Sequence, residues 1–353
     1  MDNNNYTGQD NYIEQEGNVE QDRYVEEESY IQQGGYLEQE NHAVPGDYME
    51  RARWNPKRTA TRIGLALFIM ATTITLFQII ISYLVKTFAP DVFASSWFQW
   101  ALVAASMYGI GLPVFYLMTK SLPEGRKRPK EKLKVYQFII IFFIAAATMY
   151  ITNFFSVILN FILMLFKGSD ILNPIMDAVL DGNMLITFIY TAIGAPIVEE
   201  LIFRKFMLDK LRRFGDLTAI LVTGIAFGLF HMNLAQIFYA TALGIIFAYV
   251  AIRTNTIRYS ILLHIIINTI GATIAPLAVM NENILMIMLL GLWVITSIVV
   301  GLVFFIIFVV VKKKLVIEKG EEFVPKKSVF LLNPGSLLFI AICLVSVIMV
   351  VLS

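Results

Sequence analysis

Residues 284–311 read ILMIMLLGLWVITSIVVGLVFFIIFVVV and contain no charged side chain. A helix needs roughly 20 apolar residues to cross the hydrocarbon core of a bilayer, so this stretch is long enough to span a membrane. The whole chain has the same character, because 57% of its 353 residues are hydrophobic and only 16% are charged. Soluble proteins carry roughly 25% charged residues. The sequence therefore predicts an all-α fold, a polytopic bundle of transmembrane helices.

Long apolar runs separated by short polar loops begin near residue 60. We expect about eight or nine transmembrane helices, because the run at 216–231 is short for a full crossing. This run could instead pair with the next one through a tight turn within the membrane. The candidate runs are 63–85, 97–119, 135–166, 184–204, 216–231, 234–252, 257–278, 284–311 and 335–352.

Basic residues mark one side of the predicted membrane. Clusters of Lys and Arg occur in every second loop, at 51–62, 120–134, 205–213, 253–258 and 312–327. Loops rich in Lys and Arg remain in the cytoplasm during insertion. We therefore expect a multi-pass protein of the plasma membrane whose N-terminus is cytoplasmic.

The first 50 residues differ from the rest of the chain, with 13 acidic residues and one basic residue. Such a polar segment cannot bury enough apolar surface to fold alone, so residues 1–60 are expected to form a disordered, acidic cytosolic tail. A docking strip for a cytosolic partner is the alternative. Residues 61–330 would form the membrane core, and residues 331–353 an extra transmembrane helix. A hexapeptide-like repeat in the tail places tyrosine at Tyr6, Tyr12, Tyr24, Tyr30, Tyr36 and Tyr48.

Composition also excludes several classes of protein. The apolar content excludes a soluble enzyme and a nucleic-acid binder. We therefore expect the protein to be surrounded by the lipid bilayer and to bind no nucleic acid. Cys343 is the only cysteine. No intramolecular disulfide and no cysteine-based metal cluster can therefore form.

Ionisable side chains inside the apolar runs are few. Each one costs roughly 2.5–3.5 kcal/mol on insertion scales and therefore suggests a function. Between residues 184 and 311, Glu199 and Glu200 are the acidic residues that lie inside a run rather than in a loop. His231 and His264 also lie inside runs. Two carboxylates and two imidazoles on three different helices indicate a polar site within the membrane.

Helical spacing separates the two carboxylates. Glu200 and Arg204 are four residues apart, acid first, which places them on one face in the order that favours an ion pair. Glu199 points about 100° away, and its neighbours one turn on are Ile202 and Phe203. We therefore expect Glu200 to be the structural partner of Arg204, and Glu199 to be a desolvated carboxylate that can act as a general base.

His264 and Asn268 are also four residues apart and face the same spot. Distances to the nearest charged loop place Glu199 and His264 in the cytoplasmic half of the membrane, but place His231 deeper. Convergence therefore requires the run at 216–231 to begin inside the membrane or to tilt. Taken singly, each feature also has a structural explanation, such as a histidine bonded to a backbone carbonyl or a buried helix clamp.

Three motifs follow one another on these runs: Glu-Glu-x-x-x-Arg at 199–204, Phe-x-x-x-His at 227–231 and His-x-x-x-Asn at 264–268. Together they resemble the CPBP intramembrane proteases, also called the ABI or CAAX-protease-like family. The resemblance covers about residues 135–275. It implies an endopeptidase that hydrolyses a peptide bond of a membrane-embedded peptide or protein.

The resemblance also implies a role for each residue. Glu199, with His231, would activate a water molecule for attack on the scissile carbonyl. His264 and Asn268 would stabilise the developing oxyanion, and Glu200 with Arg204 would hold the helix in place. These six residues are the predicted catalytic set.

The three motifs are compatible with catalysis with or without a bound metal ion. A glutamate and two histidines, Glu199, His231 and His264, could supply three ligands of a catalytic zinc ion. However, the chain has no His-Glu-x-x-His motif, and a metal-free glutamate mechanism suits the same residues. We expect no cofactor, with a divalent metal such as zinc as the alternative.

Two rival functions come from other classes. One is a non-catalytic membrane adaptor, or an immunity or regulatory protein that binds a membrane partner, which the acidic tail favours. The other is a transporter in which Glu199 and His264 relay protons. The tail composition and the single cysteine fit a bacterial membrane, where prenylated substrates are not expected.

Overall fold

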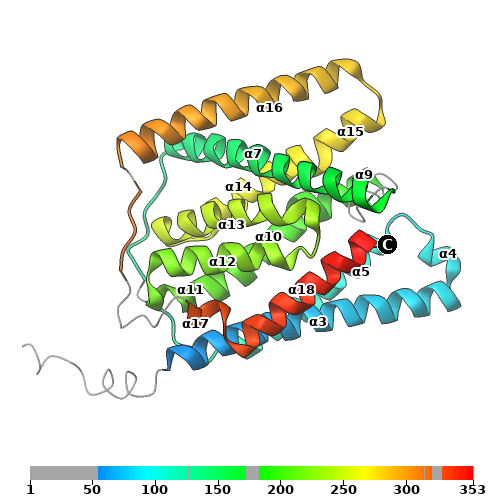
Figure 1. The fold of residues 1–353 in the computed structure, drawn as a ribbon, viewed down its shortest axis with the longest axis horizontal. Coiled ribbons are helices and arrows are strands. Elements are labelled where there is room, and N and C mark those ends of the chain that lie inside the picture. Colours follow the sequence, from blue (N-terminus) through cyan, green and yellow to red (C-terminus); the bar gives the residue numbers. More distant parts are fainter. Residues whose placement is uncertain are drawn as a thin grey trace, which may run out of the picture. The chain divides into compact units, whose positions relative to one another are not determined.

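The structure is a computed structural model that describes residues 55–125, 127–169, 171, 183–313, 315–319 and 328–352. Residues 1–54 of the predicted acidic tail, including its tyrosine repeat, lie outside the described residues, whereas residues 56–60 are the first residues of a helix, α3 (Pro56–Phe88). Residues Pro56–Ser353 belong to one compact unit. The described residues contain helices and no strands (Figure 1), so the predicted all-α fold is confirmed.

Within the described part of the chain, 8 helices are long and apolar enough to cross a membrane. One shorter apolar helix, α12 (Asp216–Phe230), accompanies them. Every run predicted from the sequence is thus a helix, and the prediction of a polytopic membrane bundle is confirmed. The long helices are Pro56–Phe88, Phe98–Thr119, Val135–Lys167, Met184–Phe214, Leu234–Thr254, Arg258–Ala278, Ile284–Val311 and Pro334–Leu352.

Helices α12 and α13 (Leu234–Thr254) form a closely packed hairpin. The turn between them is tight, as predicted, and Asn233 caps α13 by accepting a hydrogen bond from the Ala235 amide at 3.0 Å. Two glycines let the helices approach. A Cβ atom on Gly228 would lie 1.9 Å from Thr241 Oγ1, and one on Gly224 would lie 2.5 Å from a side-chain carbon of Ile245.

A second glycine contact joins α3 (Pro56–Phe88) to α18 (Pro334–Leu352), which run side by side in Figure 1. A Cβ atom on Gly64 would lie 2.3 Å from the Ser336 nitrogen. One on Gly335 would lie 2.3 Å from the Thr61 carbonyl oxygen. Helix α18 therefore packs backbone to backbone against α3.

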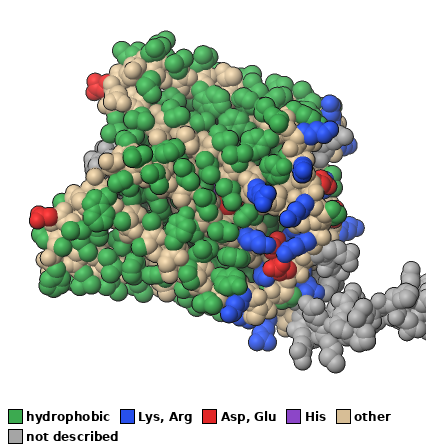
Figure 2. Space-filling view, turned by 180° about the vertical axis from the view of Figure 1, so that it is seen from behind, with side chains coloured by type: hydrophobic (Ala, Val, Ile, Leu, Met, Phe, Trp, Pro, Cys, Tyr) green, Lys and Arg blue, Asp and Glu red, His purple; other side chains and the backbone are tan. Residues whose placement is uncertain are grey.

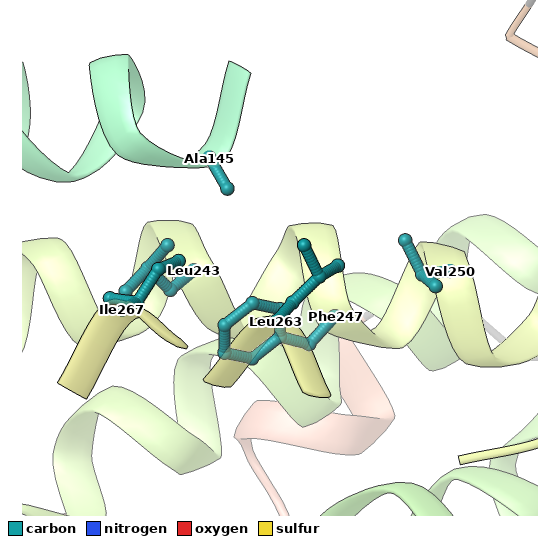
Figure 3. Packing of buried hydrophobic residues seen from close by; sticks show 6 residues of the cluster. All are labelled: Ala145, Leu243, Phe247, Val250, Leu263 and Ile267. Atoms are coloured by element: carbon teal, nitrogen blue, oxygen red, sulfur yellow. The ribbon is translucent and has the colours of Figure 1, made fainter. Parts of the chain in front are cut away.

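Helix α13 packs against both α7 (Val135–Lys167) and α14 (Arg258–Thr269), and apolar side chains of the three helices form one cluster (Figure 3). Phe247, at the centre of this cluster, has no exposed surface. Between membrane helices such a side chain stabilises the contact by close van der Waals packing, because lipid tails are as apolar as the protein interior. This packing fixes the face of α14 that carries His264. The cluster consists of Ala145, Leu243, Phe247, Val250, Leu263 and Ile267.

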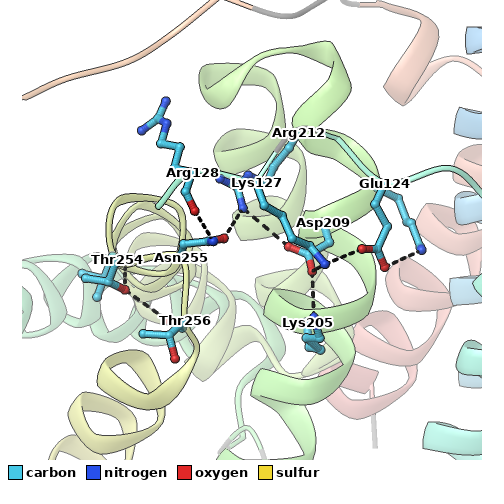
Figure 4. Close-up of polar contacts among 11 residues, drawn as sticks. Glu124, Lys127, Arg128, Lys205, Asp209, Arg212, Thr254, Asn255 and Thr256 are labelled. Carbon is cyan, nitrogen blue, oxygen red and sulfur yellow. Dashed lines mark hydrogen bonds and ion pairs between the residues drawn. The ribbon is translucent and has the colours of Figure 1, made fainter. Parts of the chain in front are cut away.

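Charged side chains gather at one end of the helices. Figure 2 shows Lys and Arg concentrated there on the visible face, and Figure 4 shows how several of them interlock. The loop at 120–134 is tied to the helix ends, because the Asn255 side chain donates to the Arg128 carbonyl and accepts from Arg212 at 2.9 Å. We call this set the basic-end network: Glu124, Lys127, Arg128, Lys205, Asp209, Lys210, Arg212, Asp216, Asn255 and Glu318.

Candidate active site

The helix at Met184–Phe214 carries both predicted carboxylates on a short α-helical segment between two π-helical turns. These are η2 (Phe188–Gly194), α10 (Ala195–Glu200) and η3 (Leu201–Met207). π-Helical turns are rare in proteins overall, but many of those that occur are found at functional sites. Such a turn changes which side chains share a face of the helix. Glu199 and Glu200 are thus the last two residues of α10, and the π-helical turns before and after α10 rotate its side chains about the helix axis relative to their positions in a regular α-helix.

Proline at position 196 frees a carbonyl for Asn268. The Ala195 amide bonds to the Tyr190 carbonyl, five residues back. In that register the next amide would bond to the Thr191 carbonyl, but Pro196 has no N–H. The Asn268 side chain donates to the Thr191 carbonyl instead, with Nδ2 at 2.9 Å. The orientation of the Asn268 amide therefore follows from the position of the proline.

Glu200 and Arg204 form the ion pair that their spacing predicts, with Nη1 3.1 Å from Oε1. Both side chains are fully buried. The guanidinium carbon lies 4.2 Å from the centre of the Phe227 ring and 5.5 Å from that of Phe247. Arginine stacks favourably on aromatic faces in this way. The pair is therefore enclosed by apolar rings and fixes α10 against α12 and α13.

His264 lies between the two carboxylates. Its Nδ1 is 3.2 Å from Glu200 Oε1, and its Nε2 is 3.6 Å from Glu199 Oε2. The first distance is that of a hydrogen bond, and the second is slightly too long for one. Spacing alone did not reveal this contact, because it assigned Glu200 to Arg204 only. In the structure Glu200 supports both Arg204 and His264.

His231 also reaches this cluster. Its Nδ1 lies 2.8 Å from the Phe227 carbonyl oxygen. Because a carbonyl oxygen only accepts hydrogen bonds, Nδ1 must carry the proton, which leaves Nε2 of a neutral ring as an acceptor. The Phe227 ring is edge-on to both imidazoles, with centroid distances of 4.8 Å to His231 and 5.8 Å to His264. The two histidines thus lie against one phenyl ring, as convergence of the motifs requires.

Exposure distinguishes the two glutamates. The Glu200 side chain has no exposed surface, whereas 14% of the Glu199 side chain is exposed. Glu199 also interacts electrostatically with His231. A carboxylate that is partly accessible and lies near two imidazoles can accept a proton from a bound water molecule. A bound water molecule can therefore reach Glu199, whereas Glu200 is enclosed by its partners.

Three tyrosines around Glu199 were missed by the sequence analysis. Tyr108, Tyr190 and Tyr239 all interact electrostatically with this carboxylate. Tyr190 also packs on the Trp100 ring, with centroids 5.6 Å apart. Their phenol groups are uncharged and belong to none of the three motifs. Only the three-dimensional packing brings them to the site.

Metal binding was tested on the geometry of the residues. Among the described residues, no three His, Cys, Asp or Glu side chains are arranged to hold a metal ion. The set Glu199, His231 and His264 is not among such groups in the described part of the chain.

Comparisons with known proteins agree with this site. Residues 181–270, which contain all six predicted residues, match the family model described as type II CAAX prenyl endopeptidase Rce1-like. A Bacillus subtilis (strain 168) protein with the printed name "Putative membrane peptidase YdiL" is 28% identical over 163 residues. That alignment covers 45% of this chain and 65% of the relative. No solved structure matches the chain significantly.

Fold and site together define a multi-pass helical membrane protein with a polar cluster of two glutamates, two histidines, an arginine and an asparagine. The resemblance read from the motifs is confirmed to this extent: residues 181–270, which carry them, match the Rce1-like family model.

Proposed function

We propose that this protein is an intramembrane endopeptidase that hydrolyses a peptide bond of a membrane-embedded peptide or protein. One observation carries the proposal: the partly exposed Glu199 carboxylate lies 3.6 Å from His264, whose other nitrogen is held by the buried Glu200–Arg204 pair. A pure scaffold gains nothing from this costly cluster. The name of the Bacillus relative is consistent with the proposal.

In the proposed reaction, Glu199 removes a proton from a water molecule while the water oxygen attacks the scissile carbonyl carbon. The carbon–nitrogen bond then breaks, and the proton passes to the leaving amine. The unprotonated Nε2 of His231 orients the water or relays the proton. Glu199 thus accepts the proton from water and later donates it to the leaving nitrogen, so it acts first as a base and then as an acid.

The oxyanion receives two donors in this proposal. Asn268 has two N–H groups on Nδ2, of which one is held by the Thr191 carbonyl and the other remains for the substrate. His264 donates through Nε2. Since Glu200 already accepts from Nδ1, His264 must carry both protons when it serves this role. Two pre-oriented donors in a dry site are each worth roughly 2.7–4 kcal/mol in the transition state.

We further propose the setting inferred from the charge pattern, a plasma membrane with the basic end and the N-terminal tail in the cytoplasm. The substrate would enter from the bilayer, and a cytosolic partner would bind the acidic tail. The reaction as written needs no cofactor. Metal independence stays a prediction, to be checked by whether chelators leave cleavage by the purified protein unchanged.

The decisive experiment compares wild type with Glu199→Gln in the native host by quantitative profiling of released and membrane-retained peptides. The substitution keeps the size of the side chain and removes only its basicity. We expect a set of peptides to disappear in the variant while its membrane level stays normal. Identical profiles would refute the protease, and if the variant also kept the wild-type phenotype, the adaptor would replace it.

A further inference from the structure

The helix Phe98–Thr119 lies outside the matched region 181–270, yet it packs along the helix that carries the carboxylates. It consists of α5 (Phe98–Ser106), the π-helical turn η1 (Met107–Gly111) and α6 (Leu112–Thr119). Three of its aromatic residues face that neighbour. Trp100 packs on Tyr190, and Tyr116 packs on Phe206 with centroids 5.1 Å apart. Between them, the Tyr108 hydroxyl donates to the Gly194 carbonyl at 2.7 Å.

This hydrogen bond is made directly before the helical segment that carries the two carboxylates. Gly194 ends the π-helical turn η2 and immediately precedes α10, the segment that ends with Glu199 and Glu200. A helical carbonyl points toward the residues four or five positions further along the chain. In α10, which is α-helical, the Gly194 carbonyl therefore points along the helix toward Val198, the residue before Glu199. The electrostatic interaction between the Tyr108 phenol and Glu199 agrees with this placement.

The surroundings of Tyr108 strengthen the contact. The residue is 40% exposed, and it lies near the middle of a helix that is long and apolar enough to cross a membrane. A phenol that finds no partner in hydrocarbon loses several kcal/mol, so its hydroxyl keeps the bond to the protein carbonyl. A carbonyl oxygen has two lone pairs, and it can accept from Tyr108 in addition to a helix amide.

We propose that Tyr108 is a positioning residue for Glu199. Its hydroxyl fixes the Gly194 carbonyl, and through it the rotation of α10 between the two π-helical turns. Loss of the hydroxyl frees this short segment to turn and moves the Glu199 carboxylate away from His264. The catalytic consequence rests on the proposed function, but the position of Glu199 can be measured without it.

Tyr108→Phe tests the proposal, with Tyr116→Phe as its matched control. Both variants remove a single phenolic oxygen from the same helix, on the side that faces the same neighbour, and both keep the aromatic ring. The probe is dicyclohexylcarbodiimide, an apolar reagent that modifies protonated carboxyl groups inside membranes. Mass spectrometry of the full-length protein in lipid vesicles gives the rate of modification at Glu199 between pH 5 and pH 9. Glu199→Gln provides the background.

We expect Tyr108→Phe to change the modification rate at Glu199 by about threefold or more and to displace its pH profile, as expected when a hydrogen bond of ordinary strength is lost. Tyr116→Phe should match wild type. In the peptide profiling, Tyr108→Phe should lower the release of Glu199-dependent peptides about tenfold at a normal protein level, because small misplacements of a catalytic group are costly.

The outcomes separate the two proposals. A modification rate and pH profile equal to those of wild type and Tyr116→Phe would overturn the role of Tyr108. A changed rate without any Glu199-dependent peptides would support the positioning of Glu199 and refute the protease. A changed modification rate with unchanged peptide release would overturn the catalytic part of the proposal.

Discussion

Two groups of charged side chains in this molecule share residue types but differ in their burial and in the number of partners that each charge has. In the buried cluster, Glu200 and Arg204 are fully enclosed, and Arg204 is the arginine paired with that carboxylate. In the basic-end network, 39% of the Glu124 side chain is exposed, and it pairs with both Lys127 and Lys210. The first group depends on each member. The second has spare partners, as is typical of charges in contact with water.

This difference predicts which charge substitutions will reduce the stability of the fold most. Burial alone would raise the pKa of Glu124, but hydrogen bonds and charges from Lys127 and Lys210 outweigh it and lower the pKa to about 2. Asp209 in the same network has three basic neighbours, Lys127, Lys205 and Arg212, at 3.7, 3.1 and 3.8 Å. Loss of one partner there leaves others in place. In the buried cluster Glu200 has Arg204 as its permanent cation, since His264, its other neighbour, is charged only when protonated.

The largest effect is expected for Arg204→Ala. The substitution leaves Glu200 in an apolar enclosure without its cation, and breaking a buried pair in this way costs about 3–5 kcal/mol. Yield and thermal melting in detergent should both fall sharply. As a control, the double variant Glu200→Leu with Arg204→Met removes both charges and should recover most of the melting temperature. If Arg204→Ala melted like wild type, the contrast between the two groups would collapse.

An intermediate effect is expected for Asp216→Asn. Asp216 is nearly buried at the start of α12, where its Oδ2 pairs with Arg128 and accepts from the Glu318 amide at 2.9 Å. Asparagine keeps an acceptor oxygen, and Arg128 keeps Glu318 at 2.8 Å. The loss should therefore be about 1–2 kcal/mol, measured as a shift of the denaturation midpoint. A loss as large as that of Arg204→Ala would show that the network has no spare partners.

The smallest effect is expected for Glu124→Gln, and it should depend on pH. Because the folded-state pKa of Glu124 lies below its ordinary value of 4.5, the ionised group stabilises the fold above pH 4.5. This contribution is lost as the pH falls toward 2. Exposure and salt keep it below about 1 kcal/mol. Melting curves of wild type and variant should differ slightly at pH 7 and converge on acidification. A gap that widened at low pH would contradict the assigned direction.

Much of the fold could be predicted because it follows from apolar length. All nine runs are helices, but some ends differ by up to ten residues, as for Met184–Phe214 against a predicted 184–204. The Glu200–Arg204 pair also followed from spacing, and the tight turn after α12 was the alternative that the short run at 216–231 suggested. The charge pattern likewise predicted orientation, which stays a prediction, since the structure contains no membrane.

The parts that could not be predicted depend on contacts between distant segments. The bridge from His264 to Glu200 needs the rotation of α10, which the π-helical turns on either side of it set. Hydropathy does not reveal a π-helical turn, because it changes the register without changing composition. Tyr108 was missed for a related reason, since an uncharged phenol on another helix carries no signal of its own. The roles of the six site residues remain predictions.

The glycine contact between α3 and α18 has a consequence for how the protein is made. A ribosome adds roughly 5–20 residues per second, so many seconds separate the emergence of Gly64 from that of Gly335. During this time α3 lacks the neighbour that packs against Gly64. Helix α3 therefore completes its set of neighbours only after α18 has entered the bilayer, and a chain halted before α18 would leave the surface around Gly64 without that partner.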